Sequence, residues 1–144
     1  MKEQLISIPV AKLAKEKGFD LTTDMIWANY YTGEPLNKWK LISFEEKTLN
    51  WMEWKAPTQA ILQKWLRETY NIDIQIISNY STYKNGNLTT EKTYRVGITY
   101  ILGGTIESFF IRPNYEIFRF IEFKTYEEAL EKGLHEALKL ITII

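Results

Sequence analysis

Two short segments of alternating apolar and polar residues, joined by a tight-turn signal, restrict the fold of this chain more than any other feature. Between them lies the dipeptide Asn85-Gly86, which favours a two-residue type I′ hairpin because both central positions need positive φ. We therefore expect two antiparallel strands, over about residues 72–80 and 94–102, each with one buried face. The side chains expected on that face are Ile72, Ile74, Ile76, Tyr94, Val96 and Ile98.

Three other segments have the spacing of amphipathic helices. The first covers residues 8–17 and ends at Gly18, because a glycine there can take the left-handed conformation that closes a helix. The second helix opens at residues 56–58. The third opens at Thr125, whose hydroxyl is expected to accept a hydrogen bond from the Glu128 amide in a capping box.

The second and third helices each have one apolar stripe that we expect to be buried. Gly133 lies on the stripe of the third helix and would allow another backbone to approach closely. The two stripes are Ile61, Leu62, Trp65, Leu66 and Thr69, and Tyr126, Leu130, Leu134, Ala137, Leu138 and Ile141.

Further strands are expected in the segments rich in aromatic and branched residues. These strands are predicted at residues 25–31, 38–44, 50–54 and 115–123, with turns at residues 32–35 and at Gly103-Gly104. The pattern as a whole predicts an α+β fold. We expect a single domain, residues 1–144, in which three helices pack on one face of a mainly antiparallel sheet to form two layers.

Composition limits the classes of function. The chain has 144 residues, and its 18 basic residues balance its 18 acidic ones, so no net charge attracts nucleic acid or anionic lipid. There is no cysteine, which excludes disulfides, thiolate nucleophiles and cysteine-ligated zinc. No apolar run approaches the roughly 20 residues that span a bilayer, and no signal-like stretch begins the chain. We therefore expect a cytoplasmic protein without membrane contact.

Residue types that carry catalysis are sparse. His135 is the one histidine, and a general base needs a positioned partner and a cleft. The glutamates at the start of the last helix have positions that favour the helix dipole, and the spacing of the acidic residues matches no metal loop. We therefore predict no catalytic residues, no metal and no cofactor.

One segment combines tryptophan with lysine. Such a combination could stack on single-stranded bases or form a protein-binding hot spot, or the tryptophans could simply cover the core. The polar face of the second helix could likewise enter a DNA groove or face solvent. The candidate binding surface consists of Trp39, Trp51, Trp54, Lys38, Lys40, Lys55, Gln63, Lys64 and Arg67.

Three segments, residues 7–19, 56–68 and 125–138, together resemble small uncharacterised proteins encoded by phages and prophages of gut Bacteroidales. The resemblance covers the three expected helices and implies a bacterial cytoplasmic setting and a mobile-element origin. It implies no activity and no site residues. From all these features we expect a non-enzymatic binding or accessory protein that acts through protein contacts. The alternative is a nucleic-acid-associated factor that binds single strands through the aromatic and basic surface.

Overall fold

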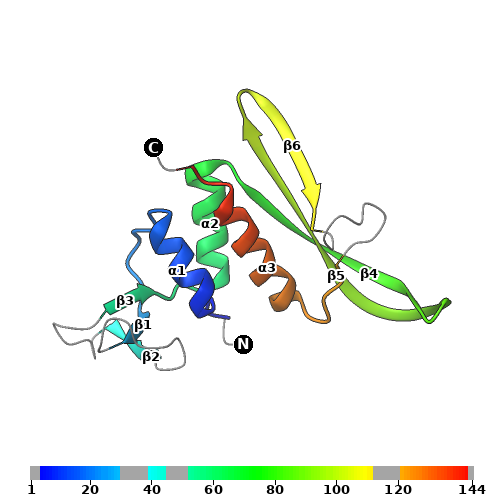
Figure 1. Cartoon of the computed structure of the whole chain (residues 1–144), viewed down its shortest axis with the longest axis horizontal. Helices are drawn as coiled ribbons and strands as arrows, with labels where there is room; N and C mark the ends of the chain where they lie inside the picture. The colour runs from blue at the N-terminus through cyan, green and yellow to red at the C-terminus, as the bar shows by residue number, and fades with distance from the viewer. Residues whose placement is uncertain (1–3, 30–38, 45–51, 112–120, 143–144) are drawn as a thin grey trace.

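The computed structural model of the chain describes residues 4–29, 39–44, 52–111 and 121–142. Within these ranges the chain forms three helices and six strands, which are drawn in Figure 1. In chain order they are α1 (Ile8–Glu16), β1 (Met25–Asn29), β2 (Lys40–Ser43), β3 (Met52–Lys55), α2 (Gln59–Tyr70), β4 (Asp73–Lys84), β5 (Asn87–Leu102), β6 (Thr105–Phe110) and α3 (Tyr126–Lys139). The α+β class is confirmed.

The described strands are divided between two antiparallel sheets, with the orders β2-β1-β3 and β4-β5-β6. The prediction of one sheet was therefore wrong. β1 pairs along both of its edges, so that Trp27 lies opposite Leu41 on one side and opposite Trp54 on the other. The helices lie between the two sheets in Figure 1: α1 contacts β3 and α3, and α3 contacts β4 and β5. They contact both sheets instead of covering one face of a single sheet.

The predicted hairpin is present. Asn85 and Gly86 have φ values of 52° and 78°, and the turn brings Lys84 opposite Asn87. The alternating side chains face the helices as expected: Ile72, Ile74, Val96 and Ile98 are buried, and Ile76 and Tyr94 are partly buried against the core.

A second hairpin extends the larger sheet. Gly103 and Gly104 have φ values of 57° and 82°, so they form a turn that leads from β5 directly into β6. The turn at the two glycines was predicted, but the strand β6 that follows it was not. A strand was predicted over residues 115–123 instead. Of that segment, residues 115–120 lie outside the described residues, and Phe123 forms an isolated bridge with Tyr94.

The smaller sheet agrees with the predicted strands where it is described. β1, β2 and β3 fall at the predicted segments 25–31, 38–44 and 50–54. The predicted turn at residues 32–35 lies outside the described residues.

The helix ends follow the predicted signals. Gly18 has φ 92°, its amide donates to Lys15 O at 3.1 Å, and the Phe19 amide donates to Ala14 O at 2.9 Å, which is the Schellman pattern. At the start of α3, the Glu128 amide donates to Thr125 Oγ1 at 3.1 Å. The capping prediction is confirmed for that bond.

Two predicted stripes needed correction. On α2, Ile61 and Thr69 are exposed whereas Gln59 is buried. Gln59 occupies an interior position because its Nε2 donates to Glu127 O at 2.9 Å, which satisfies its amide where α2 meets α3. On α3, Tyr126 is exposed while the other predicted stripe residues are buried.

α3 lies very close to the larger sheet at Gly133. A Cβ atom at this position would lie 2.8 Å from both Ile74 Cγ2 and Val96 Cγ1. The close approach predicted for this glycine is confirmed.

Candidate functional site

The tryptophans of the predicted binding surface that the structure describes are part of the core. Trp39 and Trp54 are 8% and 7% exposed, and both belong to the main apolar cluster. Their rings stack on each other and are buried, so they offer no open face to a nucleic-acid base or a protein partner. The structure thus supports the alternative in which they cover the core. Trp51 and Lys38 lie outside the described residues.

The polar members of the predicted surface belong to different elements and have different surroundings. Lys40 is exposed on β2, and Lys55 Nζ donates to Asp20 O at 2.9 Å. On α2, Gln63 Nε2 donates to Ile74 O at 3.1 Å, which makes it a link between helix and sheet.

The remaining two members, also on α2, face solvent. Arg67 is exposed, and Lys64 Nζ lies 3.9 Å from Glu68 Oε1 on the same helix, with both side chains largely exposed. An exposed pair of this kind contributes little stability. These side chains are typical of a solvated helix face.

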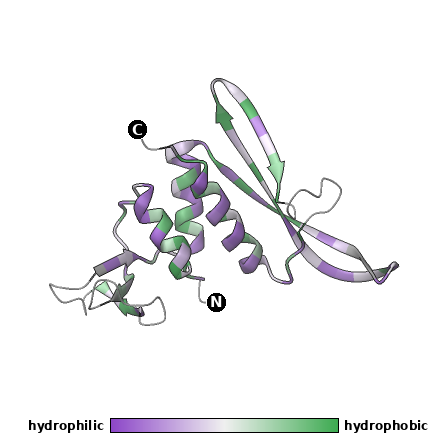
Figure 2. Ribbon diagram, viewed as in Figure 1, coloured by the Kyte–Doolittle hydropathy of each residue, from purple (hydrophilic) through white to green (hydrophobic). Residues whose placement is uncertain are grey.

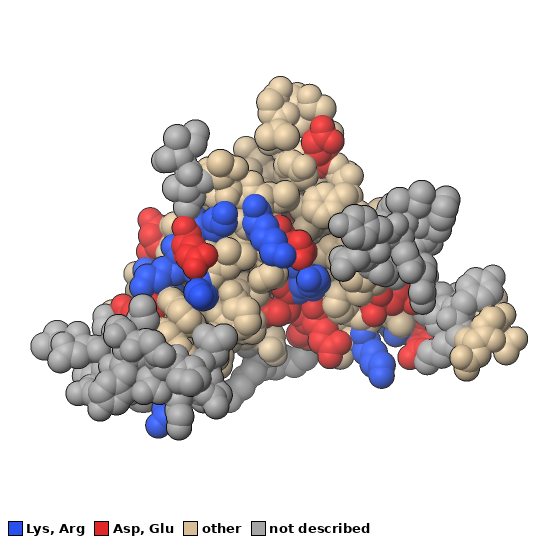
Figure 3. Space-filling view, in the orientation of Figure 1, with Lys and Arg blue, Asp and Glu red and all other residues tan. Residues whose placement is uncertain are grey.

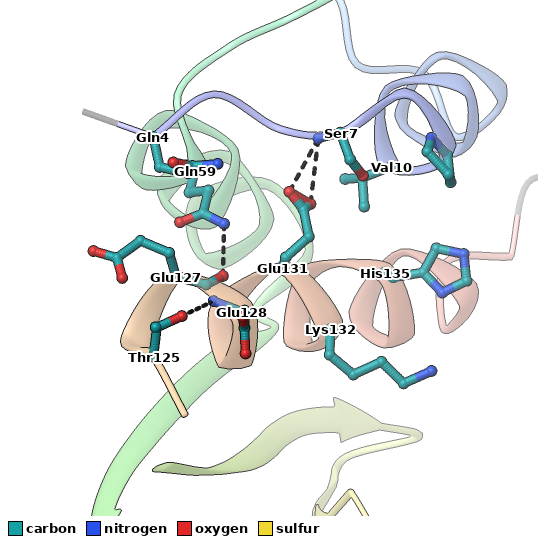
Figure 4. A pocket seen from close by; sticks show the side chains of 11 residues that line it. Gln4, Ser7, Val10, Gln59, Thr125, Glu127, Glu128, Glu131, Lys132 and His135 are labelled. Carbon is teal, nitrogen blue, oxygen red and sulfur yellow. Dashed lines mark hydrogen bonds between the residues drawn. The ribbon is translucent and has the colours of Figure 1, made fainter. Parts of the chain in front are cut away.

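A pocket of about 740 Å³ lies between the N-terminal ends of α1 and α2 and one side of α3 (Figure 4). The segment before α1 reaches the start of α2, because the Gln59 amide donates to Gln4 O at 2.8 Å and Leu5 forms a bridge with Thr58. The lining residues are Gln4, Ser7, Pro9, Val10, Gln59, Thr125, Glu127, Glu128, Glu131, Lys132 and His135.

Glu131 is the central charged group of this pocket. Its carboxylate accepts the Ser7 backbone amide, with distances of 3.0 Å to Oε1 and 3.5 Å to Oε2 (Figure 4). Burial raises the pKa of the Glu131 carboxyl, although hydrogen bonds from Ser7 and Gln59 oppose the rise. Because the Ser7 side chain makes no capping bond of its own, Glu131 supplies the acceptor at the start of α1. This glutamate therefore joins α3 to α1.

The other charged groups of the pocket do not form a catalytic set. Lys132 Nζ pairs with Glu136 Oε1 at 3.0 Å, on the same helix. Burial, together with the nearby charge of Lys139, lowers the pKa of His135. Over the residues that the structure describes, no three histidine, aspartate or glutamate side chains are grouped to hold a metal ion. The arrangement is that of a helix junction.

A second candidate site is the end of the larger sheet. Thr99 lies opposite Asp73, the first residue of β4, so β5 continues beyond this point with β6 as its partner. We call residues 99–110 the β5–β6 arm, and Figure 1 shows it projecting away from the helices. All six residues of β6 are exposed. The large apolar side chains exposed on the arm are Ile101, Leu102, Ile106, Phe109 and Phe110.

Specific contacts hold the two strands of the arm together. Thr99 Oγ1 and Ser108 Oγ lie 2.8 Å apart on one face, and Tyr100 and Phe109 form an edge-to-face ring pair at 6.2 Å on the other. The Phe110 ring lies across Gly97, where a Cβ atom would come within 3.3 Å of it. The arm is thus a defined hairpin, and Figure 2 shows hydrophobic residues on both of its strands.

The arm carries almost no charge. Glu107 is the one ionisable acidic or basic residue between residues 99 and 110, and Figure 3 shows this projection as uncharged surface with a single acidic group. A signal for the arm was present in the sequence. Gly103-Gly104 suits a type I′ hairpin as well as Asn85-Gly86 does, and it is followed by strand-forming residues.

Comparison of the chain with protein-family models, with curated proteins and with solved structures finds no match. None of the described helices is both long enough and apolar enough to cross a membrane.

Proposed function

We propose that this chain is a non-enzymatic binding protein that acts through protein contacts, and that the β5–β6 arm is its contact surface. The observation that carries the proposal is the exposure of large apolar side chains on a projecting hairpin. Ile106 is 71% exposed and Leu102 is 65% exposed. A partner that covers the arm would remove this apolar surface from water.

The size of the exposed surface supports this proposal. The five large apolar side chains of the arm together expose roughly 500 Å², with Ile101, Ile106 and Phe110 on one face and Leu102 and Phe109 on the other. Exposed apolar surface of this kind often serves in binding. Covering this area would contribute about 12 kcal/mol before the entropic cost of association is subtracted. An isolated two-stranded hairpin is also only marginally stable in water, so a partner would stabilise the arm itself.

We also propose that the chain has a mobile-element origin and acts in a bacterial cytoplasm. The support for both is the resemblance of the three helical segments to small proteins of phages and prophages. The nucleic-acid alternative has weaker support, because Trp39 and Trp54 are buried and stacked. Salt-dependent quenching of tryptophan fluorescence by single-stranded DNA would favour that alternative over the proposal.

Co-purification from the native host tests the proposal. We compare the wild-type chain with Ile106→Lys, which places a charge at the most exposed apolar position of the arm. The matched control is Leu88→Lys, since Leu88 is 63% exposed but lies at the other hairpin turn. Proteins recovered with the wild type and with Leu88→Lys should be lost with Ile106→Lys. Equal recovery with all three chains, each with the same circular dichroism spectrum, would contradict the proposal.

A further inference from the structure

We infer that the pocket between α1, α2 and α3 binds an organic cation, which carries a primary ammonium or guanidinium group on an apolar stem. The inference does not depend on the β5–β6 arm, because the described residues that line the pocket all lie outside residues 99–110. The pocket has a volume of about 740 Å³, which is typical of sites that hold small ligands.

The carboxylates of the pocket have no cationic partner in the described part of the chain. Glu127, Glu128 and Glu131 all line the pocket, and no described lysine or arginine nitrogen lies within ion-pair distance of them. Lys132 also lines the pocket, but it pairs with Glu136, and Figure 4 shows its side chain extending away from Glu131. The lining therefore has an excess of negative charge that a bound cation would balance.

Glu131 is the least solvated of the three carboxylates. Glu127 and Glu128 are exposed, whereas Glu131 is half-buried. The groups that donate to its carboxylate belong to Ser7 and Gln59 and are all uncharged. Burial raises the pKa of Glu131 despite these bonds, so the neutral donors replace the lost hydration only in part. A cation at this carboxylate would compensate for the remainder.

Gln59 adds a buried acceptor to the same pocket. The residue is only 4% exposed, and its Nε2 donates to Glu127 O at 2.9 Å. The other polar atom of this amide, Oε1, accepts no hydrogen bond from the described residues. Buried side-chain oxygens normally have a partner, so this acceptor favours a ligand that carries N–H donors. Ammonium and guanidinium groups both donate and accept nothing.

The start of α1 supplies an apolar part of the lining. Pro9 and Val10 lie in the first turn of this helix, whereas the carboxylates and the Gln59 oxygen come from α3 and α2. A ligand with a cationic head and an apolar stem matches this division. A free amine and an arginine or lysine side chain of another protein share this chemistry.

His135 makes a direct test possible, because it is the only histidine of the chain and it lines the pocket. We titrate the wild-type chain with agmatine, cadaverine or doubly capped arginine, and with pentanoate as the anionic control. NMR at constant pH and ionic strength follows the His135 ring protons and the Ser7 backbone amide. The Ser7 amide should shift because its acceptor, Glu131, becomes shared with the cation.

The cations should shift both signals with saturation, and pentanoate should shift neither. Tighter binding of agmatine or cadaverine than of capped arginine would assign a free amine as the ligand, and the reverse would assign a protein side chain. Failure of all three cations to shift the two signals at millimolar concentration would overturn the inference.

Glu131→Gln keeps the shape of the side chain and removes its charge, so it should raise the dissociation constant about tenfold or more. The matched control is Glu68→Gln, which changes the net charge equally on the exposed side of α2 and should leave the affinity unchanged. Equal affinity of the wild type and Glu131→Gln, with unchanged circular dichroism spectra, would contradict a site at Glu131. Ile106→Lys should bind the cation as the wild type does, so a failure of the arm proposal leaves this inference standing.

Discussion

The rings of Trp39 and Trp54 stack with their centroids 3.7 Å apart and their planes 9° apart. Trp54 lies opposite Trp27 in the pairing of β3 with β1, and Trp39 immediately precedes β2 on the other side of β1. Trp27 Nε1 in turn donates to Ile6 O at 3.0 Å, which ties this sheet to the segment before α1. Tryptophans therefore hold the smaller sheet together and tie it to the segment before α1.

Replacing Trp54 by alanine should destabilise the fold by about 3 to 5 kcal/mol, because a large buried side chain is removed. Urea unfolding measures the change, with Leu88→Ala as the exposed control. In a double-mutant cycle with Trp39→Ala, the two tryptophans should show a coupling of about 0.5 to 1.5 kcal/mol. A loss at Trp54 no larger than that at Leu88 would contradict its burial.

Gly133→Ala should destabilise the chain by about 1 to 3 kcal/mol, because the new methyl group overlaps Ile74 and Val96. Helix propensity alone would favour alanine by about 1 kcal/mol, so the sign of the change distinguishes the two effects. The loss should be smaller in a Val96→Ala background, where one of the clashing methyl groups is absent. A more stable Gly133→Ala chain would show that α3 is further from the sheet.

The helix caps should differ in energy. Thr58→Ala and Thr125→Ala each remove a hydroxyl that accepts a backbone amide, and each should cost about 1 kcal/mol. Ser7→Ala should cost less than either, since the Ser7 hydroxyl caps no amide of α1 and alanine keeps the backbone amide that donates to Glu131; only the contact of the hydroxyl with that carboxylate is lost. Equal losses at all three positions in urea unfolding would disagree with this division of roles.

Glu131 should make stability depend on pH. Its pKa is raised in the folded state from an ordinary value of 4.5, chiefly by burial, so the folded chain holds this proton more tightly than the unfolded chain. The stability of the wild type relative to Glu131→Gln should be constant below about pH 4.5 and should fall as pH rises above it.

Urea unfolding of both chains at several pH values measures this difference. Glu127→Gln is the control, because Glu127 is exposed on the same helix. If the wild type instead gained stability over Glu131→Gln with rising pH, the bond to Ser7 would outweigh the burial of the carboxylate.

Local sequence patterns predicted part of the fold but little of the candidate site. The alternation around Ile74 and Val96 and the turn at Asn85-Gly86 predicted the central hairpin correctly, because period and turn chemistry depend on near neighbours. The exposure of the predicted tryptophans could not be predicted from near neighbours in the same way. Whether Trp54 is exposed depends on Trp39, which approaches it only through the pairing of three strands.

The amino-acid sequence alone determined the three helices, their caps at Gly18 and Thr125, and the two tight turns, since each depends on residues within a few positions of one another. The tertiary structure decided that Gln59 and not Ile61 completes the buried stripe of α2, how the strands divide between two sheets, and that the β5–β6 arm remains exposed. These features depend on contacts between segments far apart in the chain, where an apolar side chain is buried only if another element covers it.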